Sequence, residues 1–196
     1  EPDFRGLFPS KATVVPVGKR GGRSSTRQEL IHDLIVDHAR AGRRVVRLKG
    51  GDPMLFARGG EEVQALAAAG IPFEVIPGVS AAFGAAAAAG IPLTHRGLSR
   101  ELRVLEGHHL LEDPVTDWAG LARGSATLAI YMGTGSLAAV ARQLLSHGAP
   151  PGRPMALVER AQCAGESLTL STLRLAAEGH LCPRTEGPGL VLVGEV

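Results

Sequence analysis

The chain has 196 residues, of which 44% are hydrophobic and 20% charged, so it can build one large or two small folded domains and is not expected to be disordered. Its formal net charge of +2 and its aromatic share of 4% are too low to indicate a nucleic-acid-binding protein. No apolar run reaches the roughly 20 residues that a membrane-spanning helix needs, so we expect no membrane association.

The first predicted elements are a strand, a basic loop and a helix. The strand is expected over residues 13–17, ahead of a glycine-rich loop that contains Arg20. Apolar residues at helical spacing then predict an amphipathic helix over residues 27–41. A helix of this kind is typical of the cover on one face of a sheet.

The next stretch is centred on the pair Gly50 and Gly51. A β-branched run over residues 45–48 predicts a strand that ends at this pair, and glycines allow a backbone to come very close to a ligand. Asp52 followed by proline is typical of a helix start. A further helix and strand are expected over residues 61–69 and 73–76. Strand, loop, helix and strand form half of an α/β ligand-binding sheet.

The rest of the chain continues the alternation of strands and helices. Ser80 is expected to cap a helix made almost entirely of alanine, and residues 94–98 are predicted to be a linker. Strands are then expected over residues 102–105, 127–131, 154–159, 167–170 and 189–194, and helices over 118–122, 136–146 and 173–178. The pattern predicts the α/β fold class, with two α/β domains in series, residues 1–93 and 99–196, and parallel or mixed sheets.

Several familiar site motifs are absent from the sequence. There is no phosphate-binding G-x-x-x-x-G-K-[ST], no G-x-G-x-x-G that opens a helix, no zinc-binding H-E-x-x-H and no hydrolase G-x-S-x-G. Cys163 and Cys182 have no metal-ligand or disulfide-framework spacing, which predicts a reduced, cytoplasmic protein without a metal. Loops after the predicted strands, at residues 50–52, 77–81 and 132–133, are expected to converge on a ligand. The residues alone indicate a two-lobed α/β enzyme that binds a small anionic or zwitterionic ligand.

Four ordered blocks take the interpretation further. They read VVRLKGGDP at residues 45–53, FARGGEE at 56–62, IPFEVIPGVSA at 71–81 and GIPLTHR at 90–96. These blocks, with shorter matches as far as residue 196, closely resemble the tetrapyrrole methylase family, and within it the uroporphyrinogen-III C-methyltransferases. The resemblance covers nearly the whole chain from about residue 14.

The resemblance implies a specific activity. S-adenosylmethionine would lie in a cleft between two α/β domains and methylate uroporphyrinogen III, an anionic tetrapyrrole, to give precorrin-2 for sirohaem and cobalamin synthesis; S-adenosylhomocysteine would be the product. It also implies a homodimer. The family's first strand and its glycine-proline-glycine-aspartate loop have no counterpart here, and Glu106 replaces a usual threonine. A methylase of another tetrapyrrole intermediate and a truncated, non-catalytic binding module therefore stay open as alternatives.

The same resemblance implies the site residues. The cofactor would be bound by Gly50, Gly51, Asp52, Leu55, Ser80, Ala81, Met132, Ala161 and Gly189. The substrate would be bound by Arg20, Arg58 and Met132, since arginines can meet carboxylates bidentately. Arg58, Glu61 and His108 would form the catalytic set. Three-residue spacing predicts that Arg58 and Glu61 form an ion pair if both are helical, and the final proton acceptor stays open among His108, Glu61 and water.

Overall fold

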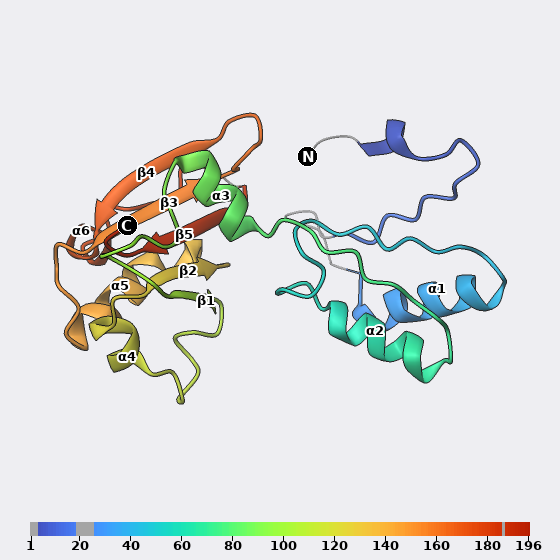
Figure 1. The fold of residues 1–196 in the computed structure, drawn as a ribbon, viewed down its shortest axis with the longest axis horizontal. Coiled ribbons are helices and arrows are strands. Elements are labelled where there is room, and N and C mark those ends of the chain that lie inside the picture. The colour runs from blue at the N-terminus through green and yellow to red at the C-terminus, as the bar shows by residue number, and fades with distance from the viewer. Residues whose placement is uncertain (1–3, 19–25, 186) are drawn as a thin grey trace. The chain divides into compact units, whose positions relative to one another are not determined.

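The structure is a computed structural model that describes residues 4–18, 26–185 and 187–196 (Figure 1). Arg20, a predicted substrate residue, lies outside these described residues. The chain divides into two compact units, residues 1–80 and 81–196. This division falls ahead of the predicted linker at 94–98, because helix α3 (Ala81–Ala89) packs its alanines against strands of the second unit.

The first unit contains a short 3-10 helix, η1 (Phe4–Leu7), and two α-helices, α1 (Gln28–Arg40) and α2 (Gly59–Ala68). The two α-helices lie side by side, and Ile31 and Ile35 are buried on α1 (Figure 1). Both predicted helices are confirmed, and α2 begins two residues earlier than predicted. No helix begins at the Asp52–Pro53 pair, so the helix start predicted there is wrong. Helix α2 begins after Arg58, which has a left-handed conformation.

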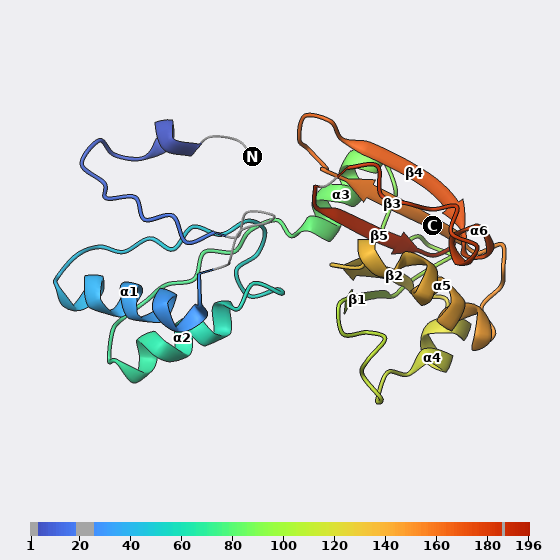
Figure 2. The same cartoon turned by 180° about the vertical axis from the view of Figure 1, so that it is seen from behind.

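The three strands predicted in this unit, over residues 13–17, 45–48 and 73–76, are also wrong. The segments are extended, but the described part of the unit contains no backbone ladder (Figure 2). The side chain of Val46 is 79% exposed, and that of Ile76 is 66% exposed. A β-branched composition favours an extended backbone, but a strand needs a neighbour with which to exchange hydrogen bonds. The α/β organisation is therefore seen in the second unit.

The second unit is built on a five-stranded sheet. Its strands are β1 (Leu102–Glu106), β2 (Thr127–Tyr131), β3 (Pro154–Glu159), β4 (Ser167–Thr172) and β5 (Gly189–Val193), in the order β1-β2-β5-β3-β4. The β1–β2 pair is parallel and the other three pairs are antiparallel. The predicted mixed sheet is confirmed, as are all five predicted strands.

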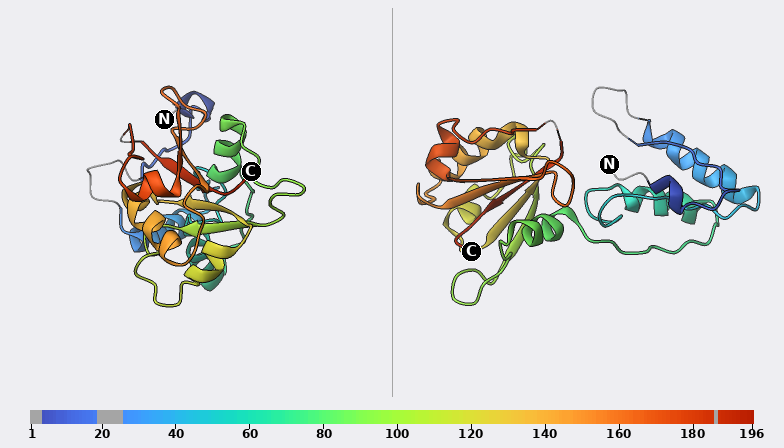
Figure 3. Two further views of the ribbon diagram at one scale, coloured as in Figure 1. Left: turned by 90° about the vertical axis from the view of Figure 1, so that its left-hand side faces the viewer. Right: turned by 90° about the horizontal axis from the view of Figure 1, so that it is seen from above.

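Helices cover both faces of this sheet (Figure 3). On one face, Ala82 and Ala85 of α3 pack against Ala156 and Leu192. The other face carries the larger core, in which Leu144 packs with leucine, isoleucine and valine side chains of the strands. The helices on that side are α4 (Trp118–Arg123), α5 (Leu137–Ser146) with the preceding 3-10 turn η2 (Thr134–Ser136), and α6 (Leu173–Ala177). No helix within the described ranges is both long and apolar enough to cross a membrane.

Candidate functional site

Backbone strain marks the loops that the sequence singles out. Among the described residues, five that are not glycine have a positive φ: Phe56, Arg58, Met132, Arg160 and Gln162. Side chains larger than glycine rarely adopt this conformation, and where they do, the strain often marks a functional site. Two of the five lie in the FARGGEE block of the first unit, and the other three follow strands β2 and β3 of the second.

In the first unit, Asp52 joins two of the predicted loops. Its Oδ1 accepts a hydrogen bond from Met54 N at 2.8 Å, and its Oδ2 accepts one from Gly78 N at 3.2 Å. Its own N–H donates to Ser80 Oγ at 3.2 Å. Asp52 thus shapes a turn and ties it to the 77–80 segment rather than capping a helix. Because a carboxylate oxygen has two lone pairs, each oxygen keeps one for a ligand cation.

The two loops come together at glycines. Gly51 has a φ of 71°, a conformation that glycine adopts without cost, and the predicted residue Gly50 beside it is exposed. A Cβ atom built on Gly78 would collide with the carbonyl oxygen of Gly51. Leu55 follows on the same loop, where its N–H donates to the carbonyl oxygen of Asp52 at 3.3 Å. The structure therefore brings together Gly50, Gly51, Asp52, Leu55 and Ser80, all predicted cofactor residues.

Replacing Gly78 by alanine is expected to destabilise the first unit by about 1–3 kcal/mol, because the new methyl group must push the Gly51 carbonyl away. Urea unfolding followed by hydrogen exchange of the first unit's amides measures this change. Gly60→Ala is the matched control, since a Cβ atom there meets nothing within 4 Å and alanine favours the helix. Equal stability of the two variants would contradict the close approach of the loops.

Arg58 and Glu61 form the predicted ion pair. Arg58 Nε and Nη2 each donate to a carboxylate oxygen of Glu61 at 2.7 Å, although Arg58 itself precedes the helix. The hydrogen bonds raise the pKa of Arg58 and lower the pKa of Glu61. Both side chains are about half exposed, so the pair presents a guanidinium edge to solvent. Because its pKa is lowered, Glu61 is a weaker base than an ordinary glutamate, which makes it a poor proton acceptor.

Glu62, which the sequence did not single out, holds the segment that precedes Gly50. Its buried carboxylate accepts hydrogen bonds from Lys49 Nζ at 2.8 Å, Arg47 Nε at 3.2 Å and Gln28 Nε2 at 3.2 Å. Burial alone would raise the pKa of Glu62, but the hydrogen bonds from Lys49 and Gln28 and the charge of Arg47 outweigh it and lower the pKa. Glu62 thereby fixes the segment that leads directly into Gly50.

In the second unit, the remaining predicted residues gather at one edge of the sheet. Strands β1, β2 and β3 end there and β5 begins there, because Glu106 pairs with Tyr131 and Glu159 pairs with Gly189. His108, Met132 and Ala161 follow these strand ends. The turns are tightly packed: Gly107 N donates to the Tyr131 carbonyl at 2.7 Å, and a Cβ atom on Gly189 would lie 2.6 Å from Thr134 Cγ2.

The start of α3 is held at the same edge. Ala82 N donates to the hydroxyl of Tyr131 at 2.8 Å, which places Ala81 beside the end of β2. Met132 follows with a left-handed backbone and a side chain that is 53% exposed. His108 is also exposed and packs edge-on against His109. The structure therefore places Ala81, His108, Met132, Ala161 and Gly189 at the same edge of the sheet.

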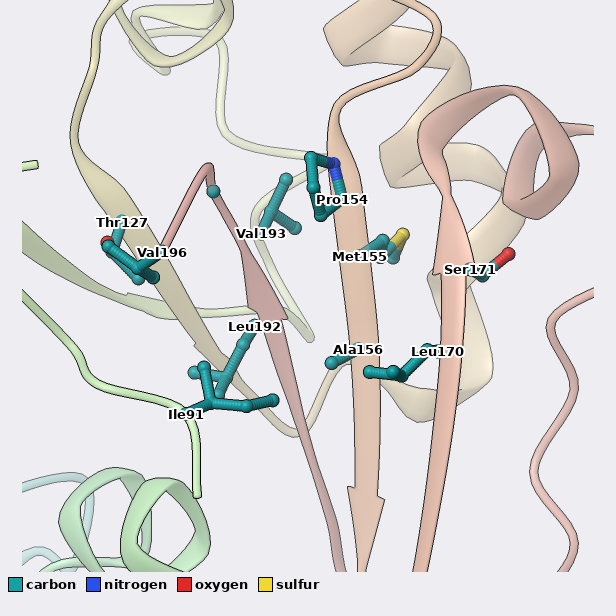
Figure 4. Close-up of a pocket in the computed structure, with 11 residues that line it drawn as sticks. Ile91, Thr127, Pro154, Met155, Ala156, Leu170, Ser171, Leu192, Val193 and Val196 are labelled. Carbon is teal, nitrogen blue, oxygen red and sulfur yellow. The ribbon is translucent and has the colours of Figure 1, made fainter. Parts of the chain in front are cut away.

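A pocket of about 240 Å³ lies at the opposite edge of the sheet (Figure 4). It is lined by Ile91, Pro154, Leu170 and Val196, among other residues, and includes none of the predicted site residues. Figure 4 shows Pro154 of the pocket at the start of β3 and Val193 at the end of β5. Met132 follows the end of β2 and Gly189 begins β5, so both lie at the other edge of the sheet. The pocket is therefore separate from the candidate site. The described ranges also hold no cluster of three or more metal-binding side chains.

The family model of the Tetrapyrrole (Corrin/Porphyrin) Methylases matches residues 1–177. The siroheme synthase 1 proteins of Yersinia pseudotuberculosis and Halorhodospira halophila are 46% and 47% identical over 195 and 193 residues, which are 100% and 98% of this chain. The chain spans only 41% and 40% of the length of these two relatives.

Solved structures of similar proteins point to the same family. The uroporphyrin-III C-methyl transferase of Thermus thermophilus complexed with S-adenyl homocysteine is 43% identical, with a TM-score of 0.72, over 86% of this chain and 73% of that one. A cobalt precorrin-4 methyltransferase shares the fold, with a TM-score of 0.75 over 89% of this chain and 72% of that one, at 23% identity. With its glycine-rich loops, mixed sheet and matched family model, the chain belongs to the tetrapyrrole methylases.

Proposed function

We propose that the chain is an S-adenosylmethionine-dependent C-methyltransferase that converts uroporphyrinogen III to precorrin-2, a precursor of sirohaem and cobalamin. The main support is the Thermus enzyme, whose structure holds S-adenyl homocysteine and whose sequence is 43% identical. The siroheme synthases add support, because the product of this reaction leads to sirohaem. The chain covers less than half of their length, so the proposal concerns the methylation alone.

The residues of the first unit fit the amino-acid part of S-adenosylmethionine, which is a zwitterion. Asp52 has a free lone pair on each oxygen after its bonds to Met54 and Gly78, and these lone pairs can accept the ammonium group. Gly50 has open space where a Cβ atom would be, so its backbone can meet the carboxylate. We propose Gly50, Gly51, Asp52, Leu55 and Ser80 as the first part of the donor site.

The residues of the second unit fit the nucleoside part of the donor. Ala161 and Gly189 offer backbone groups at one edge of the sheet, and Ala81 and Met132 lie at the same edge. Small side chains there leave room for a planar base. We propose Ala81, Met132, Ala161 and Gly189 as the second part.

The acceptor carries carboxylates, for which arginine is suited. We propose that Arg58, which is half exposed and paired with Glu61, binds one carboxylate of the acceptor, and that Arg20 and Met132 also contact the acceptor.

S-adenosylmethionine supplies an electrophilic methyl group to an electron-rich pyrrole carbon, so the residues mainly position the two reactants. A proton must leave the methylated tetrapyrrole afterwards. His108, exposed at the edge, is a better acceptor for it than Glu61, whose pKa is lowered by Arg58.

A homodimer in the cytoplasm is part of the proposal. Both cysteines, Cys163 and Cys182, are free and exposed, which suits a reducing compartment. The dimer is implied by the family resemblance, and sedimentation equilibrium of the purified protein measures it.

The test of the function is twofold. Calorimetric titration with S-adenosylhomocysteine is expected to give micromolar or tighter binding. Incubation with S-adenosylmethionine and uroporphyrinogen III is expected to add two methyl groups, detected by mass spectrometry. Binding without methylation would favour a methylase of another tetrapyrrole or a non-catalytic module. A folded protein that fails to bind S-adenosylhomocysteine would overturn the proposal.

A further inference from the structure

Glu159, the last residue of β3, is a buried carboxylate that the proposed reaction does not use. Only 1% of its surface is exposed. Its Oε1 accepts hydrogen bonds from Thr185 N and Thr185 Oγ1, both at 2.9 Å, and from Arg184 N at 3.0 Å. Its Oε2 accepts hydrogen bonds from Arg184 N and from Ser167 Oγ, both at 3.1 Å. Three of the four donor groups belong to one loop.

That loop leads directly to the candidate site. Thr185 Oγ1, which donates to Glu159, also accepts a hydrogen bond from Gly187 N at 3.2 Å. The carbonyl of Pro188 then accepts a hydrogen bond from Arg160 N at 2.9 Å, and Gly189 pairs with Glu159 in the sheet. Residues 184, 185 and 187–189 therefore lie against the end of β3, beside Ala161.

The fit between this loop and β3 is close. A Cβ atom on Gly187 would lie 2.6 Å from Arg160 Cγ, so the loop packs directly against the residue that precedes Ala161. Arg160 itself has a left-handed backbone. A strained residue and a loop held by one carboxylate indicate that the position of the backbone matters here.

We propose that Glu159 is a positioning residue that sets the backbone of Ala161 and Gly189 for the nucleoside part of S-adenosylmethionine. The proposal rests on the proposed function. Backbone contacts have no side chain that can adjust them, so their geometry depends on how the loop is held. A carboxylate suits this task because it only accepts hydrogen bonds and can take several at once, whereas an amide would turn an N–H group toward other donors. Burial alone would raise the pKa of Glu159, but the hydrogen bonds from Arg184, Thr185 and Ser167 outweigh it and lower the pKa, so the acceptor-only form is kept.

Glu159→Gln changes the carboxylate itself, Thr185→Val removes one of its donors in the loop, and Ser167→Ala removes its donor in β4. Glu159→Gln and Thr185→Val are expected to weaken S-adenosylhomocysteine binding by about tenfold or more in calorimetry. Ser167→Ala is the matched control, because it removes a hydrogen bond to the same carboxylate from β4 rather than from the loop. It is expected to change the dissociation constant less than twofold. Thr185→Ser keeps the hydroxyl and is expected to restore tight binding.

Kinetics separate positioning from general loss of structure. The KM for S-adenosylmethionine is expected to rise in Glu159→Gln and Thr185→Val while kcat is retained, as for a loss of uniform binding. The fluorescence of Trp118, in the same unit, checks that each variant is folded at the assay temperature. Wild-type binding is measured first, and its absence would overturn the proposed function and this inference together. If the wild type binds, equal affinity of the folded loop variants, or an equal loss in Ser167→Ala, would overturn this inference alone.

Discussion

Replacing Asp52 by alanine is expected to weaken S-adenosylhomocysteine binding by about 100-fold. The change removes the partner proposed for the ligand's ammonium group and also leaves the N–H groups of Met54 and Gly78 without their carboxylate. A hydrogen bond to a charged group contributes about 1.5–3 kcal/mol, and 1.4 kcal/mol corresponds to a factor of ten. The loss of the ammonium contact and of loop order together therefore gives about 3 kcal/mol. Calorimetric titration measures it directly.

The chain offers a matched control for this variant. Asp113, like Asp52, precedes a proline and accepts a hydrogen bond from the N–H two residues later, at 3.0 Å from Val115 N. Asp113→Ala breaks the same type of turn outside the proposed donor site. It is expected to leave S-adenosylhomocysteine binding unchanged. Asp52→Asn keeps an acceptor but loses the charge, so its affinity is expected to lie between those of the wild type and Asp52→Ala. Similar losses in Asp52→Ala and Asp113→Ala would argue against a specific role for Asp52.

The second unit was predictable from the sequence because its elements carry their own local signals. Thr127–Tyr131 and Pro154–Glu159 are apolar runs with clear ends, and the structure has them at the predicted bounds. The helix over Leu137–Ser146 follows from its spacing of apolar residues. Such segments form buried strands and amphipathic helices whose lengths fit the sheet that they build.

The extended segments of the first unit were not predictable in the same way. Residues 45–48 have the composition of a strand, but composition does not say whether a partner lies alongside to complete a ladder. The helix start predicted at Asp52 was wrong for a related reason. An aspartate before a proline suits both a helix start and a turn, and contacts with Gly78 and Ser80, distant in sequence, decide between them.

The candidate site shows the same limit. The family resemblance pointed to Gly51, Asp52 and Gly189, but not to the acids that hold the neighbouring backbone in place. Glu62 ends the FARGGEE block and Glu159 lies two residues before Ala161, yet their roles depend on donors far along the chain, such as Gln28 and Thr185. Periodicity carries no information on such distant pairs. Only the folded structure shows that one buried carboxylate, Glu62, holds the segment before Gly50, and that another, Glu159, holds the loop before Gly189.

Replacing Glu62 by alanine is expected to destabilise the first unit by about 3 kcal/mol. Glu62 joins α1, α2 and the 47–49 segment, and its removal leaves the amino group of Lys49, whose side chain is only 9% exposed, without an anion. Loss of one partner of a buried ion pair typically costs 3–5 kcal/mol, and the partial exposure of Arg47 puts this case at the lower end. Because Trp118 reports on the second unit, hydrogen exchange of the amides of α1 and α2 is the suitable measurement.

The pH dependence tests the same carboxylate without removing its side chain. Since the folded pKa of Glu62 is lowered, its charge contributes stability above the ordinary glutamate value near 4.5, and this contribution is lost as the pH falls through the folded pKa. Glu62→Gln is therefore expected to be less stable than the wild type at pH 7, and the gap is expected to close in acid. The neighbouring Glu61→Gln, whose ion pair is exposed, is expected to show a much smaller gap. A pH-independent gap for Glu62→Gln would mean that shape, rather than charge, holds the segment behind Gly50.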